Sequence, residues 1–158
     1  MSFFAGRPKG HAGRTAVSLY YEKQAEWKDE TAKENCRFIP AVSPGYNDRG
    51  VRLENDHPAL SRRLTEHAEE GSLFHYQLKF AKELADPGME KLIMVNSFNE
   101  WHEDTQIEPV AVGGSASWPP LMTQGLEYVG YGNLYLDILG ASTRSAEGQG
   151  IFDYLYEY

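Results

Sequence analysis

The sequence predicts an α/β fold with parallel strands. Two short apolar stretches, residues 37–42 and 91–98, have the aliphatic and β-branched composition of buried strands. Each stretch follows a segment with helical periodicity, and each is followed directly by a polar loop. Tandem helix–strand units are typical of parallel sheets, because the helix returns the chain to the same end of the sheet.

The first unit begins with a helix predicted over residues 16–35. Large side chains recur there at helical spacing, with Lys, Glu and Asp between them. The preceding residues 1–15 are rich in Gly and basic residues without periodicity, which predicts a poorly ordered segment. Pro40 interrupts the strand that follows, because proline cannot donate to a central ladder. A turn-forming run, SPGYND, comes directly after this strand.

The second unit has a helix predicted over residues 72–85, with Ser72 as a candidate N-cap. The run DPG at 86–88 is expected to end this helix. Within the strand that follows, residues 92–95 form a continuous apolar run, which predicts burial on both faces. About 20 residues without periodicity come after Pro109, a length that favours a functional loop over the site.

A last amphipathic helix is predicted over residues 131–139, and the aromatic, acidic tail at 144–158 has no assigned role. At 158 residues the chain has about the length of one domain. A complete (β/α)8 barrel needs at least about 200 residues. Because only two strands are predicted, residues 16–143 are expected to form the C-terminal portion of such a barrel. The missing part would come from a longer chain or from self-association.

Composition excludes several function classes. The net charge of −8 argues against binding to nucleic acid or to an anionic membrane. No run approaches the roughly 18 apolar residues of a membrane span, and no secretory signal is visible at the N-terminus. Localisation therefore stays open. The single Cys36 has no partner for an internal disulfide.

The loop after the second strand carries the densest chemistry. Glu100 and Glu103 stand three residues apart at the expected carboxyl end of a parallel strand, where ligand sites are built. A carboxyl pair of this kind suits general acid and base catalysis, as in glycoside hydrolysis. Trp101 could pack against a sugar ring, while Asn99 and His102 could bind hydroxyl groups. The spacing leaves retention or inversion open, and two solvated glutamates are the simpler alternative.

A metal site is a second interpretation of the same loop. His102, Glu103, Asp104 and Glu108 offer nitrogen and oxygen donors. The sequence contains neither an HExxH helix nor an Asp-rich calcium loop, so we expect no metal and no cofactor.

Three stretches resemble one family. SFNEWHEDTQIEP at 97–109 resembles the motif of glycoside hydrolase family 99, the endo-α-mannosidase-like family. VSPGYNDR at 42–49 is similar to a preceding barrel loop, and GLEYVGYGNLYLDIL at 125–139 is similar to the closing helix. The resemblance implies a (β/α)8 barrel that hydrolyses α-mannosides with retention and without a metal.

The resemblance also implies roles for particular residues. Glu100 matches a general base that acts on the sugar 2-hydroxyl, and Glu103 matches the general acid. Asn99 and Tyr46 match residues near the sugar, and Arg62 or Arg63 matches a substrate-contacting arginine. Asp104 stands where the family usually has Gly, which adds a charge beside Glu103 and removes backbone freedom.

Two functions follow from the sequence. The first is a glycosidase segment that acts on an oligosaccharide or polysaccharide through Glu100 and Glu103. The second is a non-catalytic, truncated barrel that binds carbohydrate or a partner protein through its aromatic loops.

Overall fold

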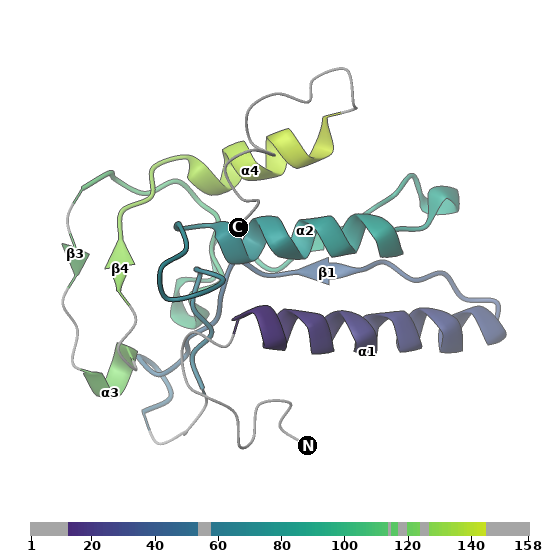
Figure 1. The fold of residues 1–158 in the computed structure, drawn as a ribbon, viewed down its shortest axis with the longest axis horizontal. Helices are drawn as coiled ribbons and strands as arrows, with labels where there is room; N and C mark the ends of the chain where they lie inside the picture. Colours follow the sequence, from purple (N-terminus) through teal and green to yellow (C-terminus); the bar gives the residue numbers. More distant parts are fainter. Residues whose placement is uncertain (1–12, 54–57, 114, 117–119, 124–126, 145–158) are drawn as a thin grey trace.

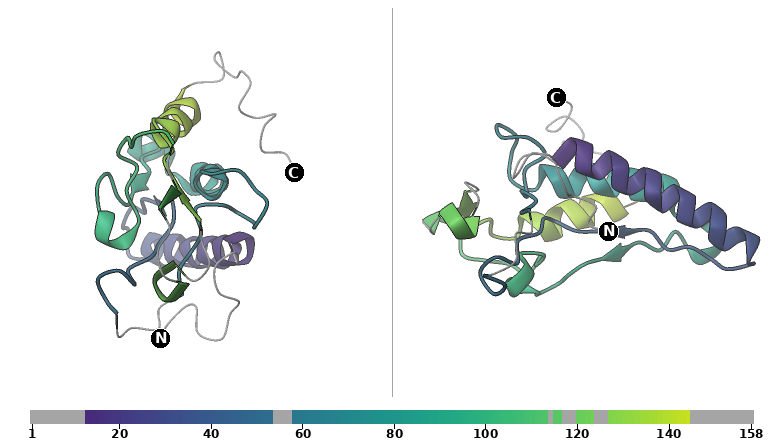
Figure 2. Two further views of the ribbon diagram at one scale, coloured as in Figure 1. Left: turned by 90° about the vertical axis from the view of Figure 1, so that its left-hand side faces the viewer. Right: turned by 90° about the horizontal axis from the view of Figure 1, so that it is seen from below.

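The computed structural model describes residues 13–53, 58–113, 115–116, 120–123 and 127–144 (Figure 1). Three longer helices, α1 (Gly13–Lys33), α2 (Ser72–Leu84) and α4 (Leu134–Thr143), pack around a short parallel strand pair, β1 (Ala41–Val42) and β2 (Met94–Val95). Figure 2 shows the strand pair running along one side of the helices. The predicted α/β class with parallel strands is therefore confirmed.

Both strands are much shorter than predicted. The amide of Met94 donates to the carbonyl of Pro40 (2.9 Å), and the amide of Asn96 donates to that of Val42 (2.8 Å). Proline supplies a carbonyl but no N–H, so the ladder does not extend towards residue 37. In the second strand, Lys91 has a φ of 57°, which places its backbone outside the extended region. The predicted strands at 37–42 and 91–98 thus each contain only two ladder residues.

The strand β2 is buried on one face only, contrary to the expectation for residues 92–95. Ile93 and Val95 pack against the hydrophobic core. Leu92 and Met94 point to the opposite face, where their exposed fractions are 51% and 59%. The helices cover a single face of the sheet, so the side chains of residues 92–95 are alternately packed on the core and exposed. The predicted burial on both faces is therefore wrong.

Side chains from two helices close the free edge of β1. The Gln24 side chain of α1 accepts a hydrogen bond from the Ala41 amide (2.8 Å) and donates to the Ala41 carbonyl (3.1 Å). The Gln77 side chain of α2 likewise accepts from the Ser43 amide (3.0 Å) and donates to the Ser43 carbonyl. These buried glutamines satisfy backbone groups that a neighbouring strand would otherwise pair.

The helices agree with the sequence, with shifted ends. The helix α1 already begins at Gly13, so residues 13–15 are helical, and the remainder of the segment predicted to be poorly ordered lies outside the described residues. The N-cap of α2 is Gly71, because the Ser72 hydroxyl instead donates to the Glu69 carbonyl at 2.6 Å. The last helix begins three residues later than predicted, after Gly132 with a φ of 60°.

The core lies between these three helices and the strands. Phe74 of α2 and Tyr135 of α4 are fully buried, with ring centroids 5.7 Å apart. The buried apolar cluster consists of Val17, Tyr21, Val42, Leu64, Leu73, Phe74, Leu78, Ala81, Ile107, Tyr135 and Ile138. It fixes the ends of both strands, and the loops that leave them, against the helices.

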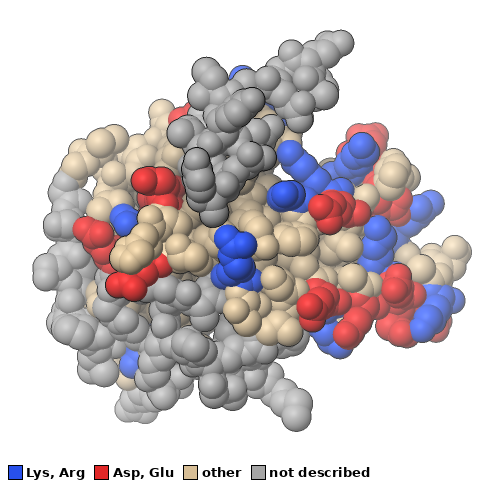
Figure 3. All heavy atoms as spheres, in the orientation of Figure 1, with Lys and Arg blue, Asp and Glu red and all other residues tan. Residues whose placement is uncertain are grey.

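The chain after Pro109 adds two short strands and a short helix. The long connection after Pro109 contains β3 (Ser115–Ala116), the short helix α3 (Pro120–Thr123) and β4 (Tyr128–Val129), and β3 pairs with β4 in an antiparallel ladder. The surface over α1 and the end of α2 carries interspersed charges of both signs (Figure 3). One exposed ion pair joins Arg37 Nη1 to Asp86 Oδ2 at 2.8 Å. None of the described helices is long and apolar enough to cross a membrane. The 144–158 tail lies outside the described residues except for its first residue.

Candidate active site

The loop after β2 folds back onto the end of its own strand. The amide of Ser97 donates to the carbonyl of Thr105 (2.8 Å), and the two hydroxyl groups of these residues lie 2.9 Å apart. Between them, a short 3-10 helix, η2 (Trp101–Glu103), reverses the chain. The polar loop predicted from sequence is therefore a closed turn at the carboxyl end of a parallel strand.

Glu100 lies at the N-cap of η2. Its Oε1 atom accepts a hydrogen bond from the His102 amide (3.0 Å) and lies 3.2 Å from His102 Nδ1. The Glu100 amide donates to the Ser97 hydroxyl at 2.8 Å. Almost half of the Glu100 side chain is exposed (46%), so its carboxylate is oriented by the turn and accessible to a ligand.

Glu103 is held by an arginine that the sequence analysis did not select. Arg52 Nη1 donates to Glu103 Oε1 (2.9 Å) and to the buried Asp48 Oδ2 (2.8 Å). The Asn47 amide also donates to the Glu103 carbonyl (2.8 Å), which joins the loop after β1 to the loop after β2. The only sequence signal for this role was that Arg52 stands four residues after Asp48, just beyond the YNDR run at 46–49.

Tyr46 belongs to the same cluster. Burial of its hydroxyl, a hydrogen bond with Asp48 and the negative charge of Glu103 raise the pKa of Tyr46 to about 12. The phenol is therefore neutral at pH 7 and can donate a hydrogen bond. The structure thus brings Tyr46 and Glu103, predicted from separate motifs, to the same guanidinium.

A cavity of about 560 Å³ lies beside this turn. Trp101 and His102, the two residues between the glutamates, line it, and Trp101 Nε1 donates to Glu108 Oε2 at 2.9 Å. The connection after Pro109 supplies another wall through Met122, Tyr128 and Tyr131. Asn99 is exposed on the loop, and its carbonyl accepts from the Trp101 amide at 3.1 Å.

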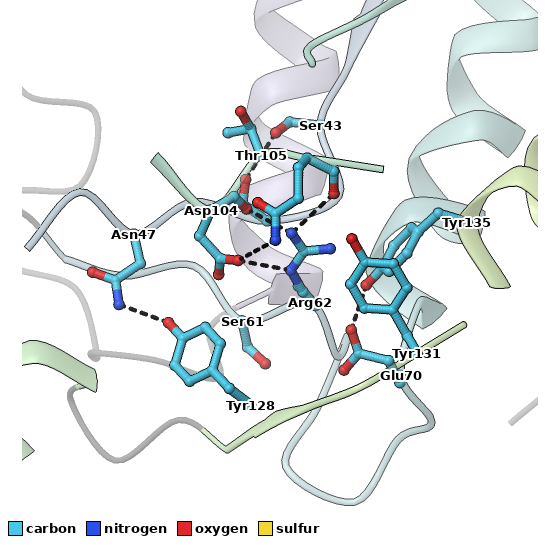
Figure 4. A network of polar contacts seen from close by, with 12 residues as sticks. Ser43, Asn47, Ser61, Arg62, Glu70, Asp104, Thr105, Tyr128, Tyr131 and Tyr135 are labelled. Atoms are coloured by element: carbon cyan, nitrogen blue, oxygen red, sulfur yellow. Dashed lines mark hydrogen bonds and ion pairs between the residues drawn. The ribbon is translucent and has the colours of Figure 1, made fainter. Parts of the chain in front are cut away.

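A buried ion pair forms part of the cavity wall. Arg62 Nε donates to Asp104 Oδ1 at 3.0 Å, and both side chains line the cavity (Figure 4). The rings of Tyr131 and Tyr135 lie over the Arg62 guanidinium, with centroids 5.2 and 4.9 Å away. Burial raises the pKa of the Asp104 carboxyl, and the charge of Arg62 opposes that shift.

The four candidate metal ligands do not converge. Glu103 binds Arg52, Asp104 binds Arg62, and Glu108 accepts from Trp101. Over the part of the chain that the structure describes, no group of three His, Cys, Asp or Glu side chains is placed to hold a metal ion. These carboxylates therefore each contact a different protein side chain.

The fold and the site define a class. The turn carries two carboxyl side chains, the kind of group that glycoside hydrolases use, next in sequence to two residues that line the cavity. The model of glycosyl hydrolase family 99 matches residues 11–144, and the chain belongs to this family. The family resemblance read from the sequence is therefore confirmed.

Known relatives agree with this assignment. The chain is 34% identical to glycoprotein endo-alpha-1,2-mannosidase of Rattus norvegicus over 110 residues, which cover 67% of this chain and 20% of the relative. It is 37% identical to a glycoprotein endo-alpha-1,2-mannosidase-like protein of Danio rerio over 76 residues, covering 48% and 15%. The matched part thus spans a fifth or less of these relatives.

The fold resembles that of a solved structure. A glycoside hydrolase-like protein matches 82% of this chain and 32% of its own, with a TM-score of 0.59 and 21% identity. At this identity the likeness concerns the arrangement of helices and strands alone.

Proposed function

We propose that this chain is the catalytic-loop segment of a glycosidase that cleaves α-mannosides with retention. The observation that carries the proposal is the turn after β2, on which Glu100 and Glu103 stand directly before and after two cavity-lining residues, Trp101 and His102, although neither glutamate lines the cavity itself. Membership in family 99 and the names of the relatives favour an α-mannoside substrate. The two parallel strands and the helix before each of them are consistent with the C-terminal portion of a (β/α)8 barrel.

Glu100 acts as the general base in the first step. It removes the proton from the sugar 2-hydroxyl, and the resulting oxygen attacks C1 while Glu103 donates its proton to the leaving oxygen. The products of this step are a 1,2-anhydro sugar and the released alcohol.

Glu103 acts as the base in the second step. It takes a proton from water, whose oxygen attacks C1 and opens the anhydro ring, and the proton held by Glu100 returns to O2. Each step inverts C1, so the overall reaction retains the configuration. Both carboxyl groups end in their starting protonation states.

The surrounding side chains supply orientation and binding. Arg52 Nη1 donates to Glu103 Oε1 at 2.9 Å, so the other oxygen, Oε2, carries the proton when Glu103 is the acid, and the His102 amide orients Glu100. Trp101 offers a flat surface for a sugar ring, while Asn99, His102 and Tyr46 offer polar groups for hydroxyls. Arg62 forms part of the cavity wall, so its contact with substrate stays a prediction.

Amide substitutions test the two glutamates separately. We expect Glu100→Gln and Glu103→Gln each to lower kcat on an α-mannoside oligosaccharide by about 10² to 10⁴-fold, the usual range for a lost acid or base. A substrate with an activated aryl leaving group needs no general acid. It should therefore restore the first step in Glu103→Gln but not in Glu100→Gln.

The matched control is Glu83→Gln, an exposed glutamate on α2, which should retain full activity. Proton NMR of the first-formed product should show the α-anomer. Unchanged kcat in either site variant, or a β-anomeric product, would overturn the mechanism.

A second candidate function is carbohydrate binding without turnover. The observation that favours it is the aromatic wall of the cavity, formed by Trp101, Tyr128 and Tyr131, in a chain that matches a fifth or less of its relatives. In that case titration calorimetry should detect glycan binding that Trp101→Ala abolishes. Glu100→Gln and Glu103→Gln should then leave the affinity unchanged.

A further inference from the structure

Asp104 occupies a backbone conformation that side chains other than glycine rarely adopt. Its φ and ψ are 54° and 35°, in the left-handed region, directly after η2. Its carboxylate is nevertheless buried, with 11% of the side chain exposed. An aspartate tolerates this region when its side chain is hydrogen-bonded, and here Oδ1 accepts from Arg62 Nε and, at 3.4 Å, from Gln106 Nε2.

Arg62 binds both the side chain and the backbone of this segment. Its Nε donates to Asp104 Oδ1 (3.0 Å), and its Nη2 donates to the carbonyls of Asp104 (3.1 Å) and Gln106 (3.0 Å). The guanidinium lies over the rings of Tyr131, just before α4, and Tyr135, within α4. The arginine therefore joins the end of the turn to α4 (Figure 4).

The segment that Arg62 holds is the one that closes the catalytic turn. The Asp104 amide approaches the Trp101 carbonyl (3.4 Å), and the Thr105 amide donates to the Glu100 carbonyl (3.2 Å). A displacement of residues 104–106 would therefore move Glu100 and Glu103 together. Neither glutamate is bonded to Arg62 or Asp104 in its side chain, so the effect passes through the backbone.

We infer that Asp104 and Arg62 are a positioning pair that fixes the η2 turn and thereby the placement of the two glutamate carboxyl groups. The catalytic consequence rests on the proposed function, whereas the structural one does not. A buried charge that loses its partner is strongly unfavourable, so the pair acts as a unit. Arginine suits this task because its planar fork can bind a carboxylate and two carbonyls at once, which lysine cannot.

Three variants separate the side-chain lock from the backbone conformation. Asp104→Gly relieves the left-handed backbone but removes the carboxylate, Asp104→Asn keeps an acceptor for Nε, and Arg62→Lys keeps only the charge. Amide hydrogen exchange of peptides covering residues 97–107 reports on the turn without any substrate. We expect exchange there to rise about 10-fold or more in Asp104→Gly and Arg62→Lys, and less in Asp104→Asn.

Peptides from α1 and α2 serve as the internal reference and should exchange at the wild-type rate. The matched control is the exposed Arg37–Asp86 pair, where Arg37→Lys should leave residues 97–107 unchanged. In the activity assay, we expect Asp104→Gly and Arg62→Lys to lower kcat about 10²-fold with little change in KM. Misplaced carboxyl groups impair the reaction more than binding.

The outcomes are distinct. If Asp104→Gly protects residues 97–107 as well as wild type does, only the backbone conformation matters and the positioning pair is refuted. If the wild-type chain shows no turnover at all, the proposed function fails, and the exchange data still decide the inference. If Asp104→Gly does not fold, Asp104→Asn and Arg62→Lys provide the same comparison with a smaller perturbation.

Discussion

Arg52 uses one guanidinium nitrogen to bind two carboxylates from different loops. Asp48 is buried and anchors the arginine, while the side chain of Glu103 is 29% exposed and faces outward. Lysine would keep the positive charge, but its single ammonium on a flexible stem defines direction less well. We predict that Arg52→Lys lowers kcat about 10-fold through poorer orientation of Glu103, measured with the same α-mannoside assay.

Arg37→Lys is again the appropriate comparison, since Arg37 also binds a carboxylate at 2.8 Å but lies far from the turn in sequence and fold. Equal kcat in the two variants would show that the Arg52 contact has no catalytic role.

Glu70 gives the protein a pH-dependent stability. The Tyr135 hydroxyl donates to Glu70 Oε1 at 2.5 Å, and burial raises the pKa of this carboxyl above its ordinary value. The folded state therefore binds the proton more tightly than the unfolded state, so the free energy of unfolding falls as pH rises through and above the ordinary glutamate pKa of about 4.3. The Glu70→Gln side chain does not titrate, so the free energy of unfolding of this variant lacks the fall with pH that Glu70 causes.

We predict that the stability of Glu70→Gln relative to wild type increases from pH 4 to pH 7, as measured by urea unfolding at each pH. A difference that stays constant over this range would mean that Glu70 is not the titrating group.

The sequence pointed to the two glutamates, and to Arg62 as a substrate contact, but not to Arg52 or to the binding of Arg62 to Asp104. Glu100, Trp101, His102 and Glu103 are adjacent in one motif, so a single stretch of chain carries the prediction. Arg52 and Arg62 reach that motif across separations of 51 and 42 residues. Charged residues in an irregular segment give no signal of which carboxylate they will meet, because the long-range fold decides it.

At the level of elements, the junction between α2 and α4 depends on the absence of a side chain at Gly71. Its φ is 82°, and a Cβ there would lie 2.6 Å from Ile138 Cδ1 and 3.3 Å from Leu134 Cδ2. Both the left-handed conformation and the overpacking are costly. We predict that Gly71→Ala lowers the free energy of unfolding by about 2 to 5 kcal/mol, measured by chemical denaturation.

Ile138→Val removes the Cδ1 atom that the new Cβ would meet, and alone it should cost about 1 kcal/mol. The double variant should therefore be more stable than the sum of the two single effects implies. Strict additivity would show that backbone strain at Gly71, and not contact with Ile138, causes the loss.

Helices were more predictable than strands for a physical reason. The stripe on α2 is set by local spacing, and its observed bounds differ from the prediction by one residue. The extent of β1 and β2 depends instead on pairing between distant segments. The carbonyl of Pro40 still joins the ladder, but its missing N–H and the positive φ of Lys91 limit that pairing to two residues each. Apolar composition indicated where the strands are, but not how long they are.

At the scale of the whole molecule, the two edges of the strand pair differ. Gln24 and Gln77 close the edge of β1 by bonding both backbone groups of Ala41 and Ser43. The other strand, β2, pairs only with β1 among the described residues, and Met94 and the neighbouring Leu92 are exposed on one face. An open edge beside exposed apolar side chains favours association with another strand. The sheet is therefore open to extension at β2 alone.

We predict that the chain self-associates through β2 and that Met94→Lys reduces this association, because a charged side chain on an edge strand disfavours strand addition. Sedimentation velocity over a concentration series should show a smaller weight-average mass for the variant, with an unchanged circular dichroism spectrum.

Val112→Lys is the matched control, since Val112 is 81% exposed but lies outside the strand pair. If both lysine variants reduce association equally, general surface hydrophobicity rather than the β2 edge is responsible. Since the edge of β1 is closed, pairing of β2 with β2 about a twofold axis would end the assembly at a dimer, whereas larger particles would require Gln24 and Gln77 to be displaced.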